Sequence, residues 1–192
     1  MRQPTLHTSR LMLRPFKMAD APAVQRLLAA REIAEMTANI PHPYEDGMAE
    51  EWILSHTSAR EDDEGASFAI TLRNEGSLTP TLCGAMGISI NAAHQHAELG
   101  YWIGVPYWNK GFATEAGFAV LHYAFAELNL NRVFACHYTK NPASGRVMQK
   151  IGMRYEGLQR QHRLKWENFE DLALYGILRD DWLAMQSISD EI

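Results

Sequence analysis

The chain has 192 residues, of which 46% are hydrophobic and 21% are charged, and its formal net charge is −5. These proportions are those of an ordinary globular protein, and the length fits one domain. The negative net charge argues against a nucleic-acid-binding surface as the main role. It suits a cationic partner, such as an amine or a basic protein.

The hydrophobic runs and the cysteines predict where the protein resides. Residues 1–10 lack the apolar core of a signal peptide, and no apolar run reaches the roughly 18 residues of a membrane span. Cys83 and Cys136 stand in apolar, strand-like runs, which favours packing residues in a reducing compartment over a disulfide or a nucleophile. We therefore expect a cytoplasmic protein with no membrane contact.

The first third of the chain predicts one strand and two helices. Residues 8–16 alternate as a strand, and Asp20 followed by Pro22 has the pattern of a helix N-terminus. A Pro- and Gly-containing loop over 37–47 separates this helix from a second one over 48–60. Residues 61–65 then form a polar turn.

The rest of the chain alternates between strands and helices. Helix signals include the apolar positions Phe118, Leu121, Phe125 and Leu128 after residue 112, and a helix from Pro142 that Gly152 ends. The predicted strands cover 66–73, 82–90, 97–105, 131–138, 153–164 and 171–178, with a hairpin loop at 74–80. Periodicity alone gives one α/β or α+β domain of order β-α-α-β-β-β-α-β-α-β-β.

Residues 97–116 are the stretch around which the chain is organised. A strand ends at Pro106, a turn containing Gly111 follows, and a helix begins directly after it. The N–H groups of such a turn and of the first helical turn converge, and the helix dipole favours negative charge there. Because Gly111 and Ala113 are small, a phosphate can approach the backbone closely.

The sequence of residues 107–116, YWNKGFATEA, resembles the coenzyme A pyrophosphate loop of the GCN5-related N-acetyltransferases (GNAT superfamily), most closely in the RimJ/RimL branch. Gly111 and Ala113 match the loop pattern, whereas Trp108 stands where Gln or Arg is common. The resemblance spans nearly the whole chain. It implies one GNAT domain over 1–192 with an α+β (α/β/α layered) fold. Its mixed, mostly antiparallel sheet of about seven strands would be splayed at the acetyl-CoA site and flanked by about four helices.

The same resemblance implies which residues hold acetyl-CoA as co-substrate. The pyrophosphate would lie on the turn and helix start, and the pantetheine arm would pair with the preceding strand as an added strand does. Asn141 resembles the family asparagine that binds the pantetheine, although it could also serve as a plain helix cap. The implied cofactor residues are Trp102, Ile103, Val105, Asn109, Lys110, Gly111, Phe112, Ala113, Thr114 and Asn141.

Two side chains are candidates for the chemistry of acetyl transfer. Glu98, near the start of the central strand, could take the proton of the acceptor amine, or it could be a polar strand-end residue. Ser144 matches an Asn-x-x-Ser position at which the RimL-like branch is thought to contact the sulfur, or it could cap its helix locally. Many GNAT enzymes carry a tyrosine where this chain has Met148, which cannot donate a proton.

The sequence indicates the residues that would bind the acceptor amine less clearly. His42 and Tyr44 lie in the loop that often forms the acceptor pocket of GNAT folds, although Tyr44 could equally pack on Trp52. Another interpretation is that His94, His96 and Glu98 alternate on one face and bind zinc.

We expect an N-acetyltransferase that works by direct attack of an amine on acetyl-CoA, without a metal. The favoured acceptor is the α-amine of a protein or peptide. The alternatives are a small amine (a polyamine, an amino acid or an amine antibiotic) or a non-catalytic module that binds acyl-CoA. The protein could be a monomer or a homodimer.

Overall fold

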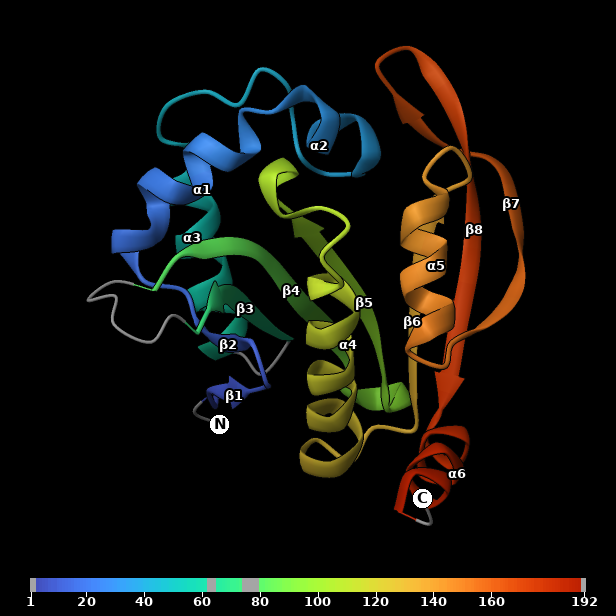
Figure 1. Cartoon of the computed structure of the whole chain (residues 1–192). Coiled ribbons are helices and arrows are strands. Elements are labelled where there is room, and N and C mark those ends of the chain that lie inside the picture. Colours follow the sequence, from blue (N-terminus) through green and yellow to red (C-terminus); the bar gives the residue numbers. More distant parts are fainter. Residues whose placement is uncertain (1–2, 62–64, 74–79, 191–192) are drawn as a thin grey trace.

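One mixed sheet carries the fold of the computed structural model, which describes residues 3–61, 65–73 and 80–190 (Figure 1). Its eight strands lie in the order β1-β2-β3-β4-β5-β6-β8-β7, and every neighbouring pair is antiparallel except β5–β6. The strands are β1 (Leu6–His7), β2 (Leu11–Pro15), β3 (Gly65–Leu72), β4 (Leu82–Asn91), β5 (His96–Ile103), β6 (Arg132–Tyr138), β7 (Arg154–Lys165) and β8 (Asn168–Leu178). The predicted α+β class and mostly antiparallel sheet are confirmed.

Six helices cover the sheet: α1 (Ala21–Leu28), α2 (Arg31–Met36), α3 (Met48–Glu61), α4 (Phe112–His122), α5 (Pro142–Lys150) and α6 (Arg179–Asp190). Neighbouring residues of β3 point to opposite faces, so Phe68 and Ala69 enter two different cores. Phe68 packs in the core that α4 covers, whereas Ala69 packs in the core under α1 and α3. Figure 1 shows α4 and α5 side by side on their face of the sheet. Within the described residues, no helix has the length and hydropathy needed to cross a membrane.

The sheet opens between β5 and β6. The parallel ladder joins only His96–Glu98 to Arg132–Phe134, whereas β5 stays paired with β4 as far as Ile103. The backbone of β5 beyond Glu98 therefore has one edge that the described part of β6 does not pair. This is the splay that the family resemblance predicts.

Several element boundaries differ from the sequence-based prediction. The strand predicted over 8–16 is the shorter β2, and β1 precedes it, because Thr8 turns the chain by bonding Leu11 through its N–H and its hydroxyl. Asp20 stands at the N-cap of α1 but does not cap it, because a preceding 3₁₀ turn holds it in helical conformation and Arg14 binds its carboxylate at 2.7 and 2.8 Å. The short helices α2 and α6 were not predicted. The expected turn at 61–65 and hairpin loop at 74–80 lie mostly outside the described residues.

The helix after the glycine turn buries most of the predicted apolar positions. Leu121 and Phe125 are buried as predicted and Leu128 is half-buried, whereas Phe118 is 43% exposed and Ala116 and Val120 pack inward. After His122 the helix widens into a π-helical turn, Tyr123–Glu127, so a strict 3.6-residue spacing does not hold. The cap predictions for α5 are confirmed: Asn141 accepts the Ser144 N–H at 3.2 Å, and Gly152 is left-handed with φ +90°.

Candidate active site

A cleft of about 1090 Å³ opens where β5 and β6 diverge. Its walls come from β4, β5, β6, the turn before α4, the first turns of α5 and the segment between α2 and α3. Ten of the predicted site residues line it: Glu98, Trp102, Ile103, Asn109, Gly111, Phe112, Ala113, Thr114, Asn141 and Ser144. The fold therefore brings the predicted cofactor and catalytic positions to one place.

The turn before α4 has the geometry of an anion cradle. Asn109 and Gly111 are both left-handed, with φ +60° and +78°, and α4 begins directly after Gly111. The Glu115 N–H already bonds the Gly111 carbonyl at 3.0 Å, but the N–H groups of Phe112, Ala113 and Thr114 have no acceptor within their own helix. These main-chain donors and the positive end of the helix dipole fit a diphosphate.

Arg10 and Glu115 brace this turn, and sequence reasoning missed both. The Arg10 guanidinium donates to the Lys110 carbonyl at 3.0 Å and to the Glu115 carboxylate at 2.7 Å. The same carboxylate accepts hydrogen bonds from the hydroxyls of Thr8 and Ser9. Burial acts to raise the pKa of the Glu115 carboxyl, but the hydrogen bonds from Thr8, Arg10 and Ser9 outweigh it and lower its pKa. The turn between β1 and β2 thus fixes the loop through an ionised carboxylate.

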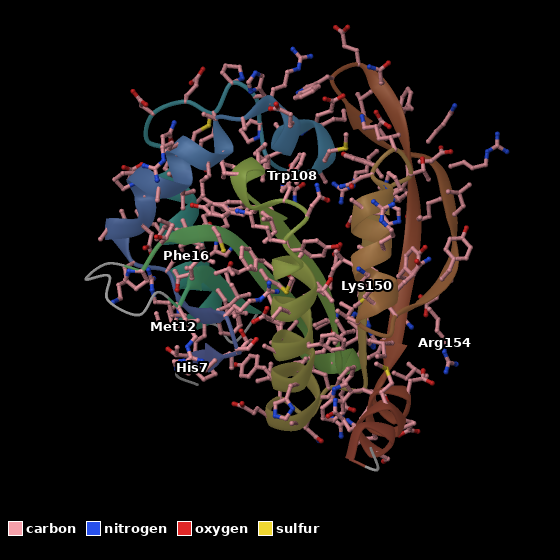
Figure 2. All side chains as sticks on the ribbon, in the orientation of Figure 1. His7, Met12, Phe16, Trp108, Lys150 and Arg154 are labelled. Carbon is pink, nitrogen blue, oxygen red and sulfur yellow. The ribbon has the colours of Figure 1, made fainter. Side chains whose placement is uncertain are left out.

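Trp108 closes the end of β5. Its indole N–H donates to the Ile103 carbonyl at 2.6 Å, and the ring lies at the loop that precedes α4 (Figure 2). This bond engages one lone pair of a carbonyl that was predicted to pair with the pantetheine arm. The departure from Gln or Arg at this position therefore has a structural role in the loop.

Two predicted cofactor residues do not line the cleft. Val105 lies in a 3₁₀ turn, Val105–Tyr107, rather than on β5, and it packs against the core under α1 and α3. The Gly104 N–H makes a last bond to the Cys83 carbonyl of β4, and the Gly104 carbonyl then accepts the Tyr107 N–H at 2.8 Å, which turns the chain and ends the strand. Lys110 directs its ammonium over the Tyr107 ring at 5.5 Å, so only its backbone belongs to the turn.

Ser144 has a partner that the sequence did not reveal. The hydroxyl of Tyr101, on β5, lies 2.7 Å from the Ser144 hydroxyl and donates to the Ser144 carbonyl at 3.1 Å. Burial raises the pKa of Tyr101 to about 12, although the Ser144 hydrogen bond acts to lower it. The tyrosine therefore keeps its proton at neutral pH. Asn141 caps α5, as its alternative interpretation proposed, and its amide also donates to the Met36 carbonyl at 3.5 Å.

Glu98 lies at the vertex of the splay. It is the last residue of β5 that pairs with β6, opposite Phe134, and its side chain is exposed in the cleft. The Cys136 thiol points at the Glu98 carboxylate, with 3.8 Å between sulfur and oxygen. Burial, followed by the Glu98 charge, raises the pKa of Cys136, so it remains a neutral thiol.

His42 and Tyr44 lie away from the cleft wall. Tyr44 is 8% exposed in the core under α1 and α3, and Trp52 packs against the same core. His42 lies beside Trp166, with 6.2 Å between ring centroids. The segment between α2 and α3 instead contributes residues 37–40 to the cleft, and α3 contributes Trp52, Ser55 and His56.

The zinc interpretation receives no geometric support. His94 ends a 3₁₀ turn, whereas His96 begins β5, and their rings are 5.8 Å apart. Among the residues that the structure describes, no three His, Cys, Asp or Glu side chains are grouped to hold a metal.

Comparisons with known proteins agree on a family. Residues 10–154 match the model described as an acetyltransferase (GNAT) domain. The uncharacterized N-acetyltransferase YnaD of Bacillus subtilis (strain 168) is 32% identical over 176 residues, which cover 91% of this chain and 97% of YnaD.

Two solved structures share the fold. RimL, a ribosomal L7/L12 alpha-N-protein acetyltransferase in complex with coenzyme A, superposes with a TM-score of 0.82 at 17% identity, over 93% of this chain and 99% of RimL. The spermidine N-acetyltransferase of Vibrio cholerae, in complex with CoA and spermine, gives 0.77 at 23% identity, over 92% and 99% of the two chains. These two neighbours act on different kinds of amine.

Proposed function

Because the chain belongs to the GNAT family of N-acetyltransferases, we propose that it transfers the acetyl group of acetyl-CoA to the N-terminal α-amine of a protein or peptide, as the RimJ/RimL branch does. One observation carries the proposal: the main-chain donors at the start of α4 adjoin a cleft that holds both Glu98 and the Tyr101–Ser144 pair. The groups proposed to bind the cofactor and the groups proposed to act in acetyl transfer then belong to a single site.

The chain's own groups would hold acetyl-CoA in two ways. The first-turn N–H groups of α4 would bind the diphosphate, with Arg10 and Glu115 keeping the turn in place. The open edge of β5 beyond Glu98 would pair with the amide groups of the pantetheine arm. The thioester carbonyl carbon would then face the floor of the splay.

Glu98 would receive the proton of the attacking amine. An α-amine has a pKa near 8, so part of it is neutral at physiological pH, whereas a lysine amine with a pKa near 10.4 is not. Glu98 is the one carboxylate among the cleft-lining residues that the structure describes. A polyamine, with several ammonium groups, would meet too little negative charge there, and this favours a peptide acceptor.

Ser144 would stabilise the leaving thiolate. The amine attacks the thioester carbon, the carbon–sulfur bond breaks, and the electron pair leaves with the sulfur. When the Tyr101 hydroxyl donates to the Ser144 hydroxyl oxygen rather than to the Ser144 carbonyl, the Ser144 proton is free to point at the sulfur. Tyr101 keeps its own proton and orients Ser144, so the thiolate receives a hydrogen bond without the tyrosine that Met148 replaces.

The acceptor screen measures release of free coenzyme A from acetyl-CoA with peptides, polyamines and amino acids. Acceptor-dependent release with free peptide N-termini, and its loss when the N-terminus is blocked, supports the proposal. Faster release with spermidine would favour the small-amine alternative, for which the fold neighbour from Vibrio cholerae is the specific observation. Binding of acetyl-CoA without release by any amine would favour a non-catalytic module.

A further inference from the structure

One face of the outer sheet, from β5 to β7, forms the acceptor side of the cleft. Glu98 pairs with Phe134 on β6. Cys136 and Tyr138 lie on the same face of β6, two and four residues after Phe134. Tyr138 pairs with Leu172 on β8, and Leu172 also lines the cleft. The neighbouring Ala173 points to the opposite face, into the core beneath α5.

Arg163 on β7 belongs to this same face. It pairs with Glu170 on β8, which is two residues from Leu172, and its side chain lines the cleft. Its positive charge acts to lower the pKa of Cys136 and of Tyr138, both of which burial raises. The guanidinium is therefore near enough to the Cys136 thiol to act on its pKa, whereas Glu98 contacts that thiol directly.

The other charges on this face are already engaged. Glu170 binds the ammonium of Lys140 rather than Arg163, and Lys165 is buried and donates to the Ile40 carbonyl at 2.7 Å. Among the described residues, Arg163 has no carboxylate within salt-bridge distance. On this face of the sheet the cleft thus presents one exposed carboxylate, Glu98, and the guanidinium of Arg163; the exposed Arg146 and Lys150 also line the cleft, but from α5.

We infer that Arg163 binds a carboxylate of the acceptor, and that the acceptor is a peptide N-terminus with an acidic residue shortly after the α-amine. This inference rests on the proposed function and restricts the acceptor to peptides with an acidic residue near the N-terminus. β6 and β8 lie between β5 and β7, so about 14 Å separates the two strands across the sheet, and Arg163 also lies further along the strands than Glu98. A free amino acid, whose amine and carboxylate share one carbon, is too short to reach both groups. An extended chain gains about 3.4 Å per residue, so the acidic side chain has to follow the α-amine by at least about two residues.

The test compares short amidated peptides that differ only at the third residue, which is aspartate, asparagine or lysine. We expect kcat/KM from coenzyme A release to be about fivefold to tenfold higher for aspartate than for asparagine, as a partly exposed charge-assisted contact would give, and lowest for lysine. Arg163→Gln should remove the preference mainly by raising KM for the aspartate peptide. Arg163→Glu should reverse the order in favour of lysine.

Arg160→Gln is the matched control, because Arg160 is an exposed arginine of the same strand that does not line the cleft. It should keep the full preference for aspartate. Equal rates for the aspartate and asparagine peptides in the unmodified protein, or a preference that survives Arg163→Gln, would overturn the inference while leaving the proposed function intact. Free aspartate acetylated as fast as the aspartate peptide would overturn it as well. No release with any peptide would overturn the proposed function and this inference together.

Discussion

Replacing Glu115 with Gln tests whether the brace between β2 and α4 organises the diphosphate loop. The carboxylate accepts hydrogen bonds from the Thr8 hydroxyl at 2.6 Å, the Ser9 hydroxyl at 3.1 Å, the Arg10 N–H at 2.9 Å and Arg10 Nε at 2.7 Å. A glutamine retains a single carbonyl oxygen and turns an NH₂ group toward donors that it cannot satisfy.

The structure sets the size of the effect. Hydrogen bonds to a charged group contribute about 1.5–3 kcal/mol. The Arg10 side chain is 52% exposed and Glu115 is 15% exposed, so the lower part of that range applies and we expect a loss of about 2 kcal/mol. For a chain of this length, that corresponds to a Tm lower by about 4–8 °C. Binding of acetyl-CoA should weaken as well, because Arg10 also holds the Lys110 carbonyl.

The difference should depend on pH with a definite sign. Because the pKa of the folded Glu115 is lowered from 4.5, the carboxylate stabilises the native state fully above that ordinary value. Its contribution is lost as the pH falls through the lowered pKa. Urea unfolding at neutral and at acidic pH, with calorimetry of acetyl-CoA binding, measures both effects.

Glu127→Gln is the control, since Glu127 is an exposed carboxylate at the end of the π-helical turn that continues α4. It should leave the urea midpoint and the affinity for acetyl-CoA as they are. A Glu115→Gln protein with an unchanged urea midpoint at neutral pH would refute the reasoning, as would a deficit that grows on acidification.

Three further changes address the cleft. Gly111→Val should abolish acetyl-CoA binding in calorimetry, because a β-branched residue does not tolerate φ +78°; retained affinity would show that the left-handed turn is dispensable. Glu98→Gln should lower turnover more at about pH 6.5 than at about pH 9, where more of the α-amine is already neutral, and equal losses would remove Glu98 from the role of base. Ser144→Ala and Tyr101→Phe should each lower kcat by about tenfold with the affinity for acetyl-CoA nearly kept; an unchanged kcat in either variant would exclude that hydroxyl from thiolate stabilisation.

Local chemistry could be predicted from the sequence because it acts over a few residues. The cap at Asn141, the proline after it and the left-handed Gly152 all follow from backbone preferences of single residue types. The strand–turn–helix around Gly111 is local in the same sense. The resemblance of its sequence to the GNAT loop also predicted the splay of the sheet beside it.

The contacts that brace the site were out of reach because they join distant segments. Arg10 and Glu115 are 105 residues apart, and Tyr101 and Ser144 are 43 apart, so no spacing rule connects them. The prediction for Phe118 was wrong for another reason: the π-helical turn after His122 changes the register, so Phe125 is buried although Phe118, seven residues earlier, is exposed. Val105 was misplaced because the strand ends before Pro106, where a backbone bond from the Tyr107 N–H to the Gly104 carbonyl turns the chain.

The three-residue ladder between β5 and β6 has an energetic consequence for the whole sheet. On the proposed function, the pantetheine arm supplies amide groups along the edge of β5 that β6 leaves open. The substrate then acts as a removable ninth element of the sheet, so occupancy and fold stability are linked. Amide exchange along residues 99–103 should therefore slow when acetyl-CoA is added, and this makes the backbone itself a reporter of the loaded enzyme.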